Sequence, residues 1–198
     1  MFAGLRRRKL KARASGPFLW PVCLHRINSN DDSAQNHNLD LAMKLLGHGF
    51  YWQDLKVGDR YKTYGRTVAA HDITAFCNVV GYVEPLFTDA EYRKSHSALP
   101  GFAAPAALVY AVAEGLALAG TGHGTGLAFL HADMNVKGPV VAGDTISVHI
   151  EITESRASSK GRGLVRSRNE VLNQRGDIVM IYTPLRLMAG HPDTSISV

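Results

Sequence analysis

One segment constrains the fold of this chain more than any other, because residues 105–119 are apolar on nearly every side. Pro105 stands at a position that the first turn of a helix tolerates, and the residues after it include a single charged side chain, Glu114. A helix that is apolar all round must be buried. Spanning a membrane takes about twenty apolar residues, so this shorter segment is expected to be the central core helix of a folded domain and not a membrane span.

The sequence after this helix has the pattern of β-strands. Ile146, Val148, Ile150 and Ile152 alternate with more polar residues, as in a strand that buries one face. Turns with glycine and aspartate separate this strand from its neighbours, and a polar loop at 155–163 is expected to close a hairpin. Extended segments are expected at 61–69, 126–136, 145–153, 164–173 and 178–187, with a short helix starting at His71.

These elements predict the fold class and the domain limits. Long strands that follow one buried helix suggest an α+β domain, in which a curved antiparallel sheet wraps around that helix. A chain of 198 residues with 45% hydrophobic residues can bury one ordinary core. The prediction is a single domain over residues 46–190, with a basic, disordered extension over 1–45 and a short tail over 191–198.

The positive charge of the chain is concentrated before this domain. The formal net charge is +5, but seven Lys and Arg residues precede the first acidic residue, Asp31. Without those seven, fifteen basic residues remain against seventeen acidic ones. The domain itself is therefore slightly acidic, and its net charge gives no reason to expect nucleic acid as a partner.

The residues before the domain are not expected to direct secretion. Pro17 and Pro21 interrupt the short apolar stretch there, which a secretory signal would need intact. An arginine-rich, acid-free start is compatible with an organelle transit peptide, but the expectation is a cytoplasmic protein whose extension has no function of its own. The other interpretation of this extension is that translation starts at Met43, which opens a segment that leads into the domain. Cys23 and Cys77 are too few for a disulfide framework or a zinc site, so no metal is expected.

Five blocks of the sequence resemble the MaoC-like acyl dehydratases, a family that includes the (R)-specific enoyl-CoA hydratases. The blocks occur in the order and with the spacing of that family, and they lie at 51–59, 67–76, 105–116, 123–130 and 139–145. The resemblance implies a hot-dog fold that dimerises by continuing its sheet. It also implies an acyl thioester substrate, carried by coenzyme A or by a carrier protein, and a second copy or a related hot-dog subunit as the protein partner.

The catalytic segment is where this chain departs from the family. The hydratases resemble G-D-x-N-P-[IL]-H-x-D, and residues 81–89 read Gly-Tyr-Val-Glu-Pro-Leu-Phe-Thr-Asp. Tyr82 replaces the aspartate, Glu84 the asparagine and Phe87 the histidine. In the family, the aspartate and histidine position the water that adds to, or leaves from, an unsaturated thioester. Because phenylalanine cannot transfer a proton, the ordinary mechanism does not carry over to this chain.

Candidate catalytic residues remain on and near this segment. Tyr82 and Glu84 could donate or accept a proton if burial shifts their pKa values toward neutrality. His96 follows closely enough in the sequence to enter the same cleft. The alternatives are that Glu84 is a surface carboxylate or a partner for a neighbouring base, and that His96 is exposed and idle. Asp72 is expected to be a structural residue at a helix start.

Candidate substrate-binding residues lie around the core helix. In the family, a backbone N–H at the start of this helix polarises the thioester carbonyl; Ala106 stands there in place of the usual glycine and keeps the donor. A tightly packed helix start without a ligand is the alternative. Pro105 and Phe87 are expected to line the same site, and His123 lies in the glycine-rich stretch 120–126, near the expected pantetheine path. That stretch lacks the strand and helix of a phosphate-binding loop, so no nucleotide cofactor is expected.

Two hypotheses of function follow from these residues. The first is a lyase of the acyl-thioester hydratase and dehydratase kind, which uses a rearranged acid/base set around Tyr82 and Glu84. The second is a non-catalytic hot-dog subunit that binds acyl chains or completes a partner's site. A polar group that faces the acyl end of the tunnel would favour the enzyme.

Overall fold

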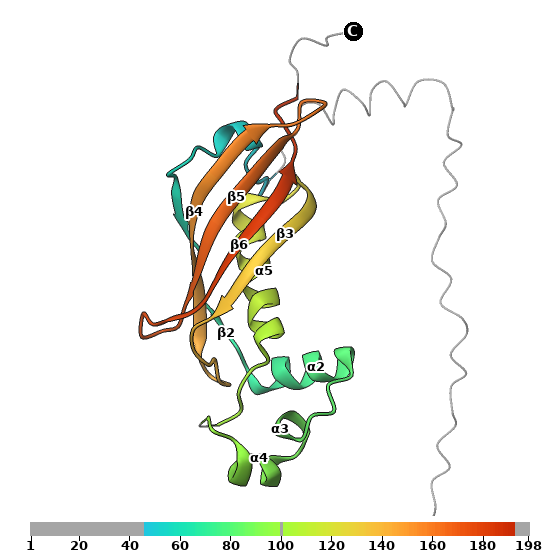
Figure 1. The fold of residues 1–198 in the computed structure, drawn as a ribbon, viewed down its shortest axis with the longest axis vertical. Helices are drawn as coiled ribbons and strands as arrows, with labels where there is room; N and C mark the ends of the chain where they lie inside the picture. The colour runs from blue at the N-terminus through green and yellow to red at the C-terminus, as the bar shows by residue number, and fades with distance from the viewer. Residues whose placement is uncertain (1–45, 100, 193–198) are drawn as a thin grey trace, which may run out of the picture. The chain divides into compact units, whose positions relative to one another are not determined.

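The structure is a computed structural model, and it describes residues 46–99 and 101–192 (Figure 1). The predictions made for residues 1–45 and for the last six residues of the chain lie outside these ranges. In chain order, the elements are η1 (Trp52–Asp54), β1 (Arg60–Lys62), β2 (Arg66–Thr67), α2 (Ala70–Val80), α3 (Pro85–Thr88), α4 (Ala90–His96), α5 (Ala106–Thr121), β3 (Gly126–Val136), β4 (Thr145–Ala157), β5 (Gly163–Leu172) and β6 (Ile178–Met188).

The strands of the described residues form one antiparallel sheet that curves around α5 (Figure 1). The strand order is β1-β4-β5-β6-β3, and the short β2 pairs with β4 beyond the end of β1. Strands β4, β5 and β6 are long and joined by hairpins, whereas β3 crosses to the far edge beside β6. This arrangement confirms the predicted α+β hot-dog fold, with the sheet wrapped around one central helix.

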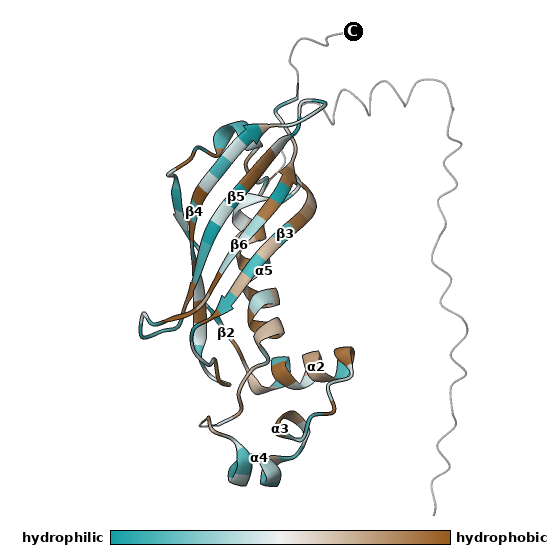
Figure 2. Cartoon of the chain, viewed as in Figure 1, coloured by the Kyte–Doolittle hydropathy of each residue, from teal (hydrophilic) through white to brown (hydrophobic). Residues whose placement is uncertain are grey.

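The core lies between the inner face of the sheet and one side of α5. The four isoleucine and valine residues that alternate along β4 are all buried, as are Val165 and Val171 on β5. On α5 the buried side chains are Leu108, Val109, Val112, Ala113 and Ala117. Each large apolar side chain buried in this way stabilises the fold by about 1.5–3 kcal/mol. Figure 2 shows the alternation as bands of hydrophobic and hydrophilic residues along the strands.

Helix α5 is the predicted core helix, and its buried side chains lie along one side of it. Ala107, Ala111, Gly115 and Ala119 recur every four residues and are exposed on the side turned away from the core. The sheet can cover only one side of a helix, and these small residues occupy the other. No helix in the described ranges is long and apolar enough to cross a membrane.

Two short helices, α3 and α4, were not predicted from the sequence. Helix α3 starts at Pro85, a residue that suits the first position of a helix because it has no N–H to satisfy. Helix α4 is capped by Asp89, whose Oδ1 accepts hydrogen bonds from the backbone N–H groups of Glu91 at 2.9 Å and Tyr92 at 3.0 Å. The last residue of the 81–89 motif is therefore an N-cap.

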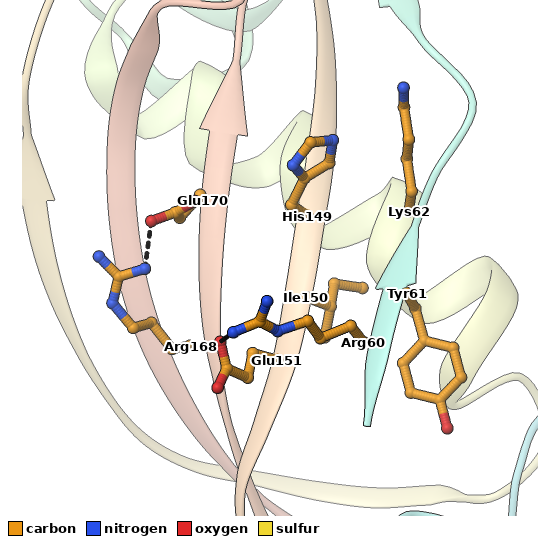
Figure 3. Close-up of a pocket in the computed structure, with 8 residues that line it drawn as sticks. All are labelled: Arg60, Tyr61, Lys62, His149, Ile150, Glu151, Arg168 and Glu170. Carbon is orange, nitrogen blue, oxygen red and sulfur yellow. Dashed lines mark hydrogen bonds and ion pairs between the residues drawn. The ribbon is translucent and has the colours of Figure 1, made fainter. Parts of the chain in front are cut away.

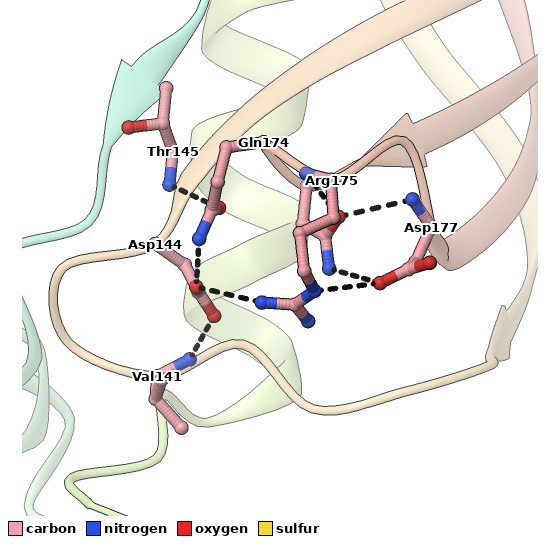
Figure 4. A network of polar contacts seen from close by, with 7 residues as sticks. Val141, Asp144, Thr145, Gln174, Arg175 and Asp177 are labelled. Carbon is pink, nitrogen blue, oxygen red and sulfur yellow. Dashed lines mark hydrogen bonds and ion pairs between the residues drawn. The ribbon is translucent and has the colours of Figure 1, made fainter.

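The turn before β4 is held by a buried carboxylate (Figure 4). Asp144 Oδ2 accepts a hydrogen bond from Val141 N at 2.9 Å, and its Oδ1 accepts one from Gln174 Nε2 at 2.7 Å. Arg175 Nη1 lies 4.0 Å from the same Oδ1. These contacts tie the turn before β4 to the hairpin between β5 and β6, so the Gly-Asp of the fifth resemblance block has a structural role here.

Candidate active site

The segment that carries residues 81–89 lies outside the sheet, near the N-terminal end of α5 (Figure 1). Helix α2 anchors it, because its inward-facing residues Ile73 and Cys77 are buried in the core. Burial raises the pKa of the Cys77 thiol, which favours the unreactive protonated form. At the other end of the segment, Arg93 donates to Leu86 O at 2.7 Å and places its guanidinium over the ring of Phe102, 4.3 Å from the centroid. The segment is thus fixed to the loop that leads into α5.

Aromatic rings fill positions 82 and 87, at which the resemblance leads us to expect an acid/base dyad. The ring of Tyr82 meets the edge of Phe76 with the centroids 6.0 Å apart, and it stacks on Phe87 at the same separation. Phe87 is half-buried and packs against the core. Tyr82 is 42% exposed, so its hydroxyl is the proton-bearing group that this aromatic cluster of Phe76, Tyr82 and Phe87 presents.

Glu84 lies between these rings in the sequence, directly before α3, and is exposed. Its backbone carbonyl accepts hydrogen bonds from Phe87 N at 2.9 Å and Thr88 N at 3.2 Å, which fixes the first turn of α3. Among the described residues, no side chain forms a hydrogen bond or ion pair with the Glu84 carboxylate. The carboxylate is therefore accessible to water and to a ligand, and both the catalytic and the surface interpretations of this residue stand.

His96 ends α4 and is engaged within its own helix. Its ring stacks on that of Tyr92, with the centroids 4.0 Å apart and the planes 4° from parallel. Its Nδ1 lies 2.8 Å from Ser95 Oγ and 3.1 Å from Tyr92 O. The structure thus places His96 on the exposed side of α4, in contact with its helical neighbours and not with Tyr82 or Glu84.

The start of α5 opens onto an apolar pocket of about 250 Å³. Pro105 is the N-cap residue, and its carbonyl accepts from Leu108 N at 2.9 Å and Val109 N at 3.2 Å. In the part of the chain that the structure describes, no backbone carbonyl accepts a hydrogen bond from the N–H of Ala106. The residues that line the pocket are Leu99, Ala103, Ala104, Ala106, Val109, Val136, Gly138, Pro139, Val140, Val179 and Met180. Ala106, the first residue of the helix, thus has a free backbone donor and also lines an apolar cavity, the two features that a carbonyl-binding site needs.

A buried ion pair near the middle of α5 was missed from the sequence. Arg186 Nη2 donates to both carboxylate oxygens of Glu114, at 2.5 and 2.7 Å, and the two side chains are 11% and 13% exposed. The pair lies at one side of a pocket of about 520 Å³ between α5 and β3. With a rise of 1.5 Å per residue, Glu114 is about 12 Å along the helix from Ala106, too far to act on a carbonyl held there.

His123 lies at the end of α5 opposite to Ala106. It is exposed, it borders the pocket between α5 and β3, and its backbone carbonyl accepts from Gly49 N at 2.7 Å. Of the residues predicted to bind substrate, the structure thus groups Pro105 and Ala106 at one end of the helix. His123 is a whole helix length away in the same chain.

A further groove of about 550 Å³ lies on the outer face of the sheet (Figure 3). Its charged residues largely pair with one another: Arg60 Nη2 lies 3.1 Å from Glu151 Oε2, and Arg168 pairs with Glu170. These side chains alternate with buried residues such as Ile150, so they face away from α5 and from the candidate active site. In the described residues, no group of three or more His, Cys, Asp or Glu side chains could hold a metal ion.

Comparison with known proteins assigns the chain to a family. Residues 55–182, well over half of the chain, match the family described as the FAS1-like, dehydratase domain region. The chain belongs to this family. No curated protein sequence matches the chain significantly.

Solved structures agree with this family assignment. The MaoC-like dehydratase of Rhodospirillum rubrum is 26% identical, with a TM-score of 0.63 over 73% of this chain and 99% of the other. An R-hydratase of Pseudomonas aeruginosa is 27% identical, with a TM-score of 0.59 over 73% and 88%. A Mycobacterium tuberculosis protein with a double hot-dog fold shares the fold at 22% identity, with a TM-score of 0.66 over 73% and 46%. The predicted relationship to the MaoC-like dehydratases is confirmed.

Proposed function

We propose that this member of the dehydratase family binds an acyl thioester with the thioester carbonyl at the start of α5. The free N–H of Ala106 would donate to the carbonyl oxygen, and the partial positive charge of the helix N-terminus would stabilise the charge that develops on it. The apolar pocket beside Ala106 would hold the first part of the acyl chain. The single observation that carries this proposal is the unused backbone donor of Ala106, a residue that lines that pocket.

The acid/base step is assigned to Glu84 and Tyr82. Hydration needs a base that takes a proton from water and an acid that delivers one to the α-carbon, and dehydration needs the reverse. Glu84 offers an accessible carboxylate as the base, and the Tyr82 hydroxyl is the acid. Both belong to the segment that Arg93 fixes beside the loop entering α5. On this proposal, the protein is a lyase that works with a non-standard pair.

A specific observation favours a second function, a non-catalytic acyl-binding subunit. The aromatic cluster of Phe76, Tyr82 and Phe87 is apolar apart from one hydroxyl, and Glu84 is open to solvent. Such a surface can hold an acyl group and exclude water from it without any proton transfer. The substrate would then be bound, or presented to a partner, and not hydrated.

The same fold suggests a homodimer, or a pair with a related hot-dog subunit. Strand β3 is the last strand of the sheet among the described residues, and within them no strand pairs with its outer edge. Apolar side chains along it are about half exposed: Leu127 51%, Phe129 52%, Leu130 50%, Met134 50% and Val136 50%. A second copy that continues the sheet at β3 would cover them.

The binding proposal is tested by removing the Ala106 donor alone. Ala106→Pro deletes the N–H at the first helical position, where proline is tolerated, and the extended ψ of 139° at Pro105 suits a following proline. Binding of a saturated acyl-CoA, which keeps the thioester carbonyl but has no double bond to hydrate, should weaken roughly 2- to 10-fold, the value of one hydrogen bond. Ala106→Ser keeps the N–H and is the matched control. Equal affinity of both variants, with unchanged thermal stability, would rule out this donor.

A further inference from the structure

A cluster of polar side chains is buried between α5 and the sheet, apart from the candidate active site. Asn169 on β5 and Tyr182 on β6 are 0% exposed, and Ser167 is 3% exposed. Beside them lies the ion pair of Glu114 and Arg186. Neither the proposed binding of an acyl thioester nor the packing of apolar residues accounts for polar groups at this depth.

Several atoms of this cluster lack partners among the described residues. They are Asn169 Nδ2, Asn169 Oδ1, Tyr182 Oη and Arg186 Nε. A buried polar atom without a hydrogen bond is strongly destabilising, so native proteins satisfy such atoms with protein groups or with bound water. Four unpaired atoms within one cluster point to a ligand that bonds to some of them.

Two residues of this cluster that carry unpaired atoms, Asn169 and Arg186, line a small cavity. Its volume of about 10 Å³ is the space that one water molecule needs, and Ser167, Asn169 and Arg186 line it on the side of the sheet. Ala117, Thr121 and Gly122 close it on the side of α5. A water site also needs two to four polar partners, and this cavity supplies them.

We propose that one water molecule binds in this cavity and closes a ring of hydrogen bonds through Asn169, Tyr182, Glu114 and Arg186. The water oxygen accepts from Arg186 Nε. One water hydrogen goes to Asn169 Oδ1 and the other to Ser167 Oγ. The ring continues from Asn169 Nδ2 to Tyr182 Oη, from the Tyr182 hydroxyl to the Glu114 carboxylate, and back to Arg186 through the ion pair.

Each hydrogen bond of this ring joins one donor to one acceptor. The Tyr182 hydroxyl lies near both Asn169 and Glu114, so small side-chain rotations bring it to hydrogen-bonding distance of each. Burial raises the pKa of this hydroxyl, which therefore stays protonated and remains a donor. A single water together with these rotations satisfies all four unpaired atoms. A cation in the same place would face the positive charge of Arg186, so water is the ligand that fits.

The ring joins three elements, adding to the ion pair between α5 and β6 and to the backbone pairing of β5 with β6. Glu114 belongs to α5, Asn169 to β5, and Tyr182 and Arg186 to β6. Hydrogen bonds have directions that apolar contacts lack, so the ring fixes the rotation of α5 against the sheet. The same contacts hold Glu114 and Arg186 at the side of the pocket between α5 and β3.

The direct test is a crystal structure of the full chain at a resolution that shows ordered water. We expect one peak of water density within hydrogen-bonding distance of Arg186 Nε, Asn169 Oδ1 and Ser167 Oγ. A cavity without density, or Asn169 Oδ1 bonded to a protein group instead, would overturn the proposal.

The direction of the stability change in two variants gives an independent test. Tyr182→Phe and Asn169→Leu nearly keep the side-chain volume and break the ring, so each should lower the melting temperature by roughly 3–10 °C. Without the ring, each variant would remove only unpaired buried atoms, and stability would stay the same or rise. Tyr110→Phe is the matched control, because its ring packs edge-on against Tyr182 at 5.1 Å and its hydroxyl takes no part in the ring. An unchanged or raised melting temperature in both variants would contradict the water site.

Discussion

The ring of Tyr82 stacks on the ring of Phe87, with the centroids 6.0 Å apart and the planes inclined by 27°. These are the two positions at which the resemblance leads us to expect an aspartate and a histidine. The two side chains therefore pack as a unit, and the ring of Tyr82 also meets that of Phe76. Two packed aromatic rings form an apolar surface, which differs chemically from an acid/base dyad that has lost one member. The chemistry of the site has to be tested as that of an aromatic surface.

Wild-type protein should hydrate crotonyl-CoA and longer enoyl-CoA substrates at rates near background. A positioned acid/base group contributes about 10²- to 10⁴-fold, and Phe87 cannot transfer a proton at all. The double variant Tyr82→Asp with Phe87→His should bring back measurable hydration, while Tyr82→Asp alone should not. The assay is loss of the enoyl-thioester absorbance. Rapid hydration by the wild type would mean that Glu84 and Tyr82, or an acid and base elsewhere in the chain, replace the dyad on these substrates.

If the protein turns over its own substrate, Glu84→Gln should lower kcat far more than it changes KM. The substitution removes proton transfer but nearly preserves size and polarity, so ground-state binding is kept. A fall of about 10²-fold or more in kcat is expected. Glu91→Gln, which changes an exposed carboxylate on α4, is the control. Full activity in a variant that combines Glu84→Gln with Tyr82→Phe would move the chemistry away from this segment and leave the acyl-binding function as the better account.

The strands and the core helix could be predicted because their signals are local. Alternating residues predict a strand wherever one face of the sheet is buried, as the alternating burial along β4 shows. The predicted segment 126–136 also coincides with β3, Gly126–Val136. Asp72 was expected at a helix start, and its Oδ2 does accept a hydrogen bond from Ala69 N at 2.9 Å. Strand β4 continues to Ala157, beyond the predicted end, because its pairing with β5 extends into the polar hairpin.

What the sequence could not predict depends on contacts between distant residues. Glu114 and Arg186 are far apart in the chain, and each is a single charge within an apolar element. The sequence therefore did not indicate that the two side chains form an ion pair. The one-sided burial of α5 was missed because hydropathy does not distinguish small exposed residues from small buried ones. The isolated Glu114 within an apolar helix was the available signal, since a charge at that position needs a partner.

The stability that Asp72 provides should disappear in acid. The hydrogen bond from Ala69 N, together with Arg66 at 3.1 Å, holds the pKa of the Asp72 carboxyl below its usual value. A carboxyl with a lowered folded pKa stabilises the fold above its unfolded pKa, and loses that contribution as the pH falls through the folded pKa. Asp72→Ala should therefore cost about 1 kcal/mol of unfolding free energy at pH 7 and progressively less below pH 4. Denaturant titrations at several pH values measure this difference. A constant difference down to the lowest pH would be inconsistent with this origin.

Gly163 should not tolerate a methyl group. It stands at the start of β5, where a Cβ would lie 2.1 Å from Cγ of Trp52. The indole is held in place by a hydrogen bond from its Nε1 to Gly161 O at 3.0 Å, so it cannot easily move aside. Gly163→Ala should destabilise the fold by about 1–3 kcal/mol, as overpacking typically does. Gly138→Ala, at a position with open space around its Cβ, is the control, and thermal unfolding of both variants is the measurement. Equal stability of the two variants would show that Trp52 packs differently.

A charge placed on β3 should separate the proposed dimer. Met134 is half exposed on the edge strand, and its backbone pairs with that of Tyr182 on β6. A lysine on an edge strand opposes pairing with a second strand, because its charge would have to be desolvated at the interface. We expect the wild type to be a dimer by light scattering at micromolar concentration and Met134→Lys to be a monomer with a similar circular dichroism spectrum. Thr153→Lys places the same charge at an exposed position on β4, away from the free edge, and should remain dimeric. If the wild type is a monomer when no partner protein is present, the homodimer proposal is wrong. A related hot-dog subunit would then be the candidate that covers β3.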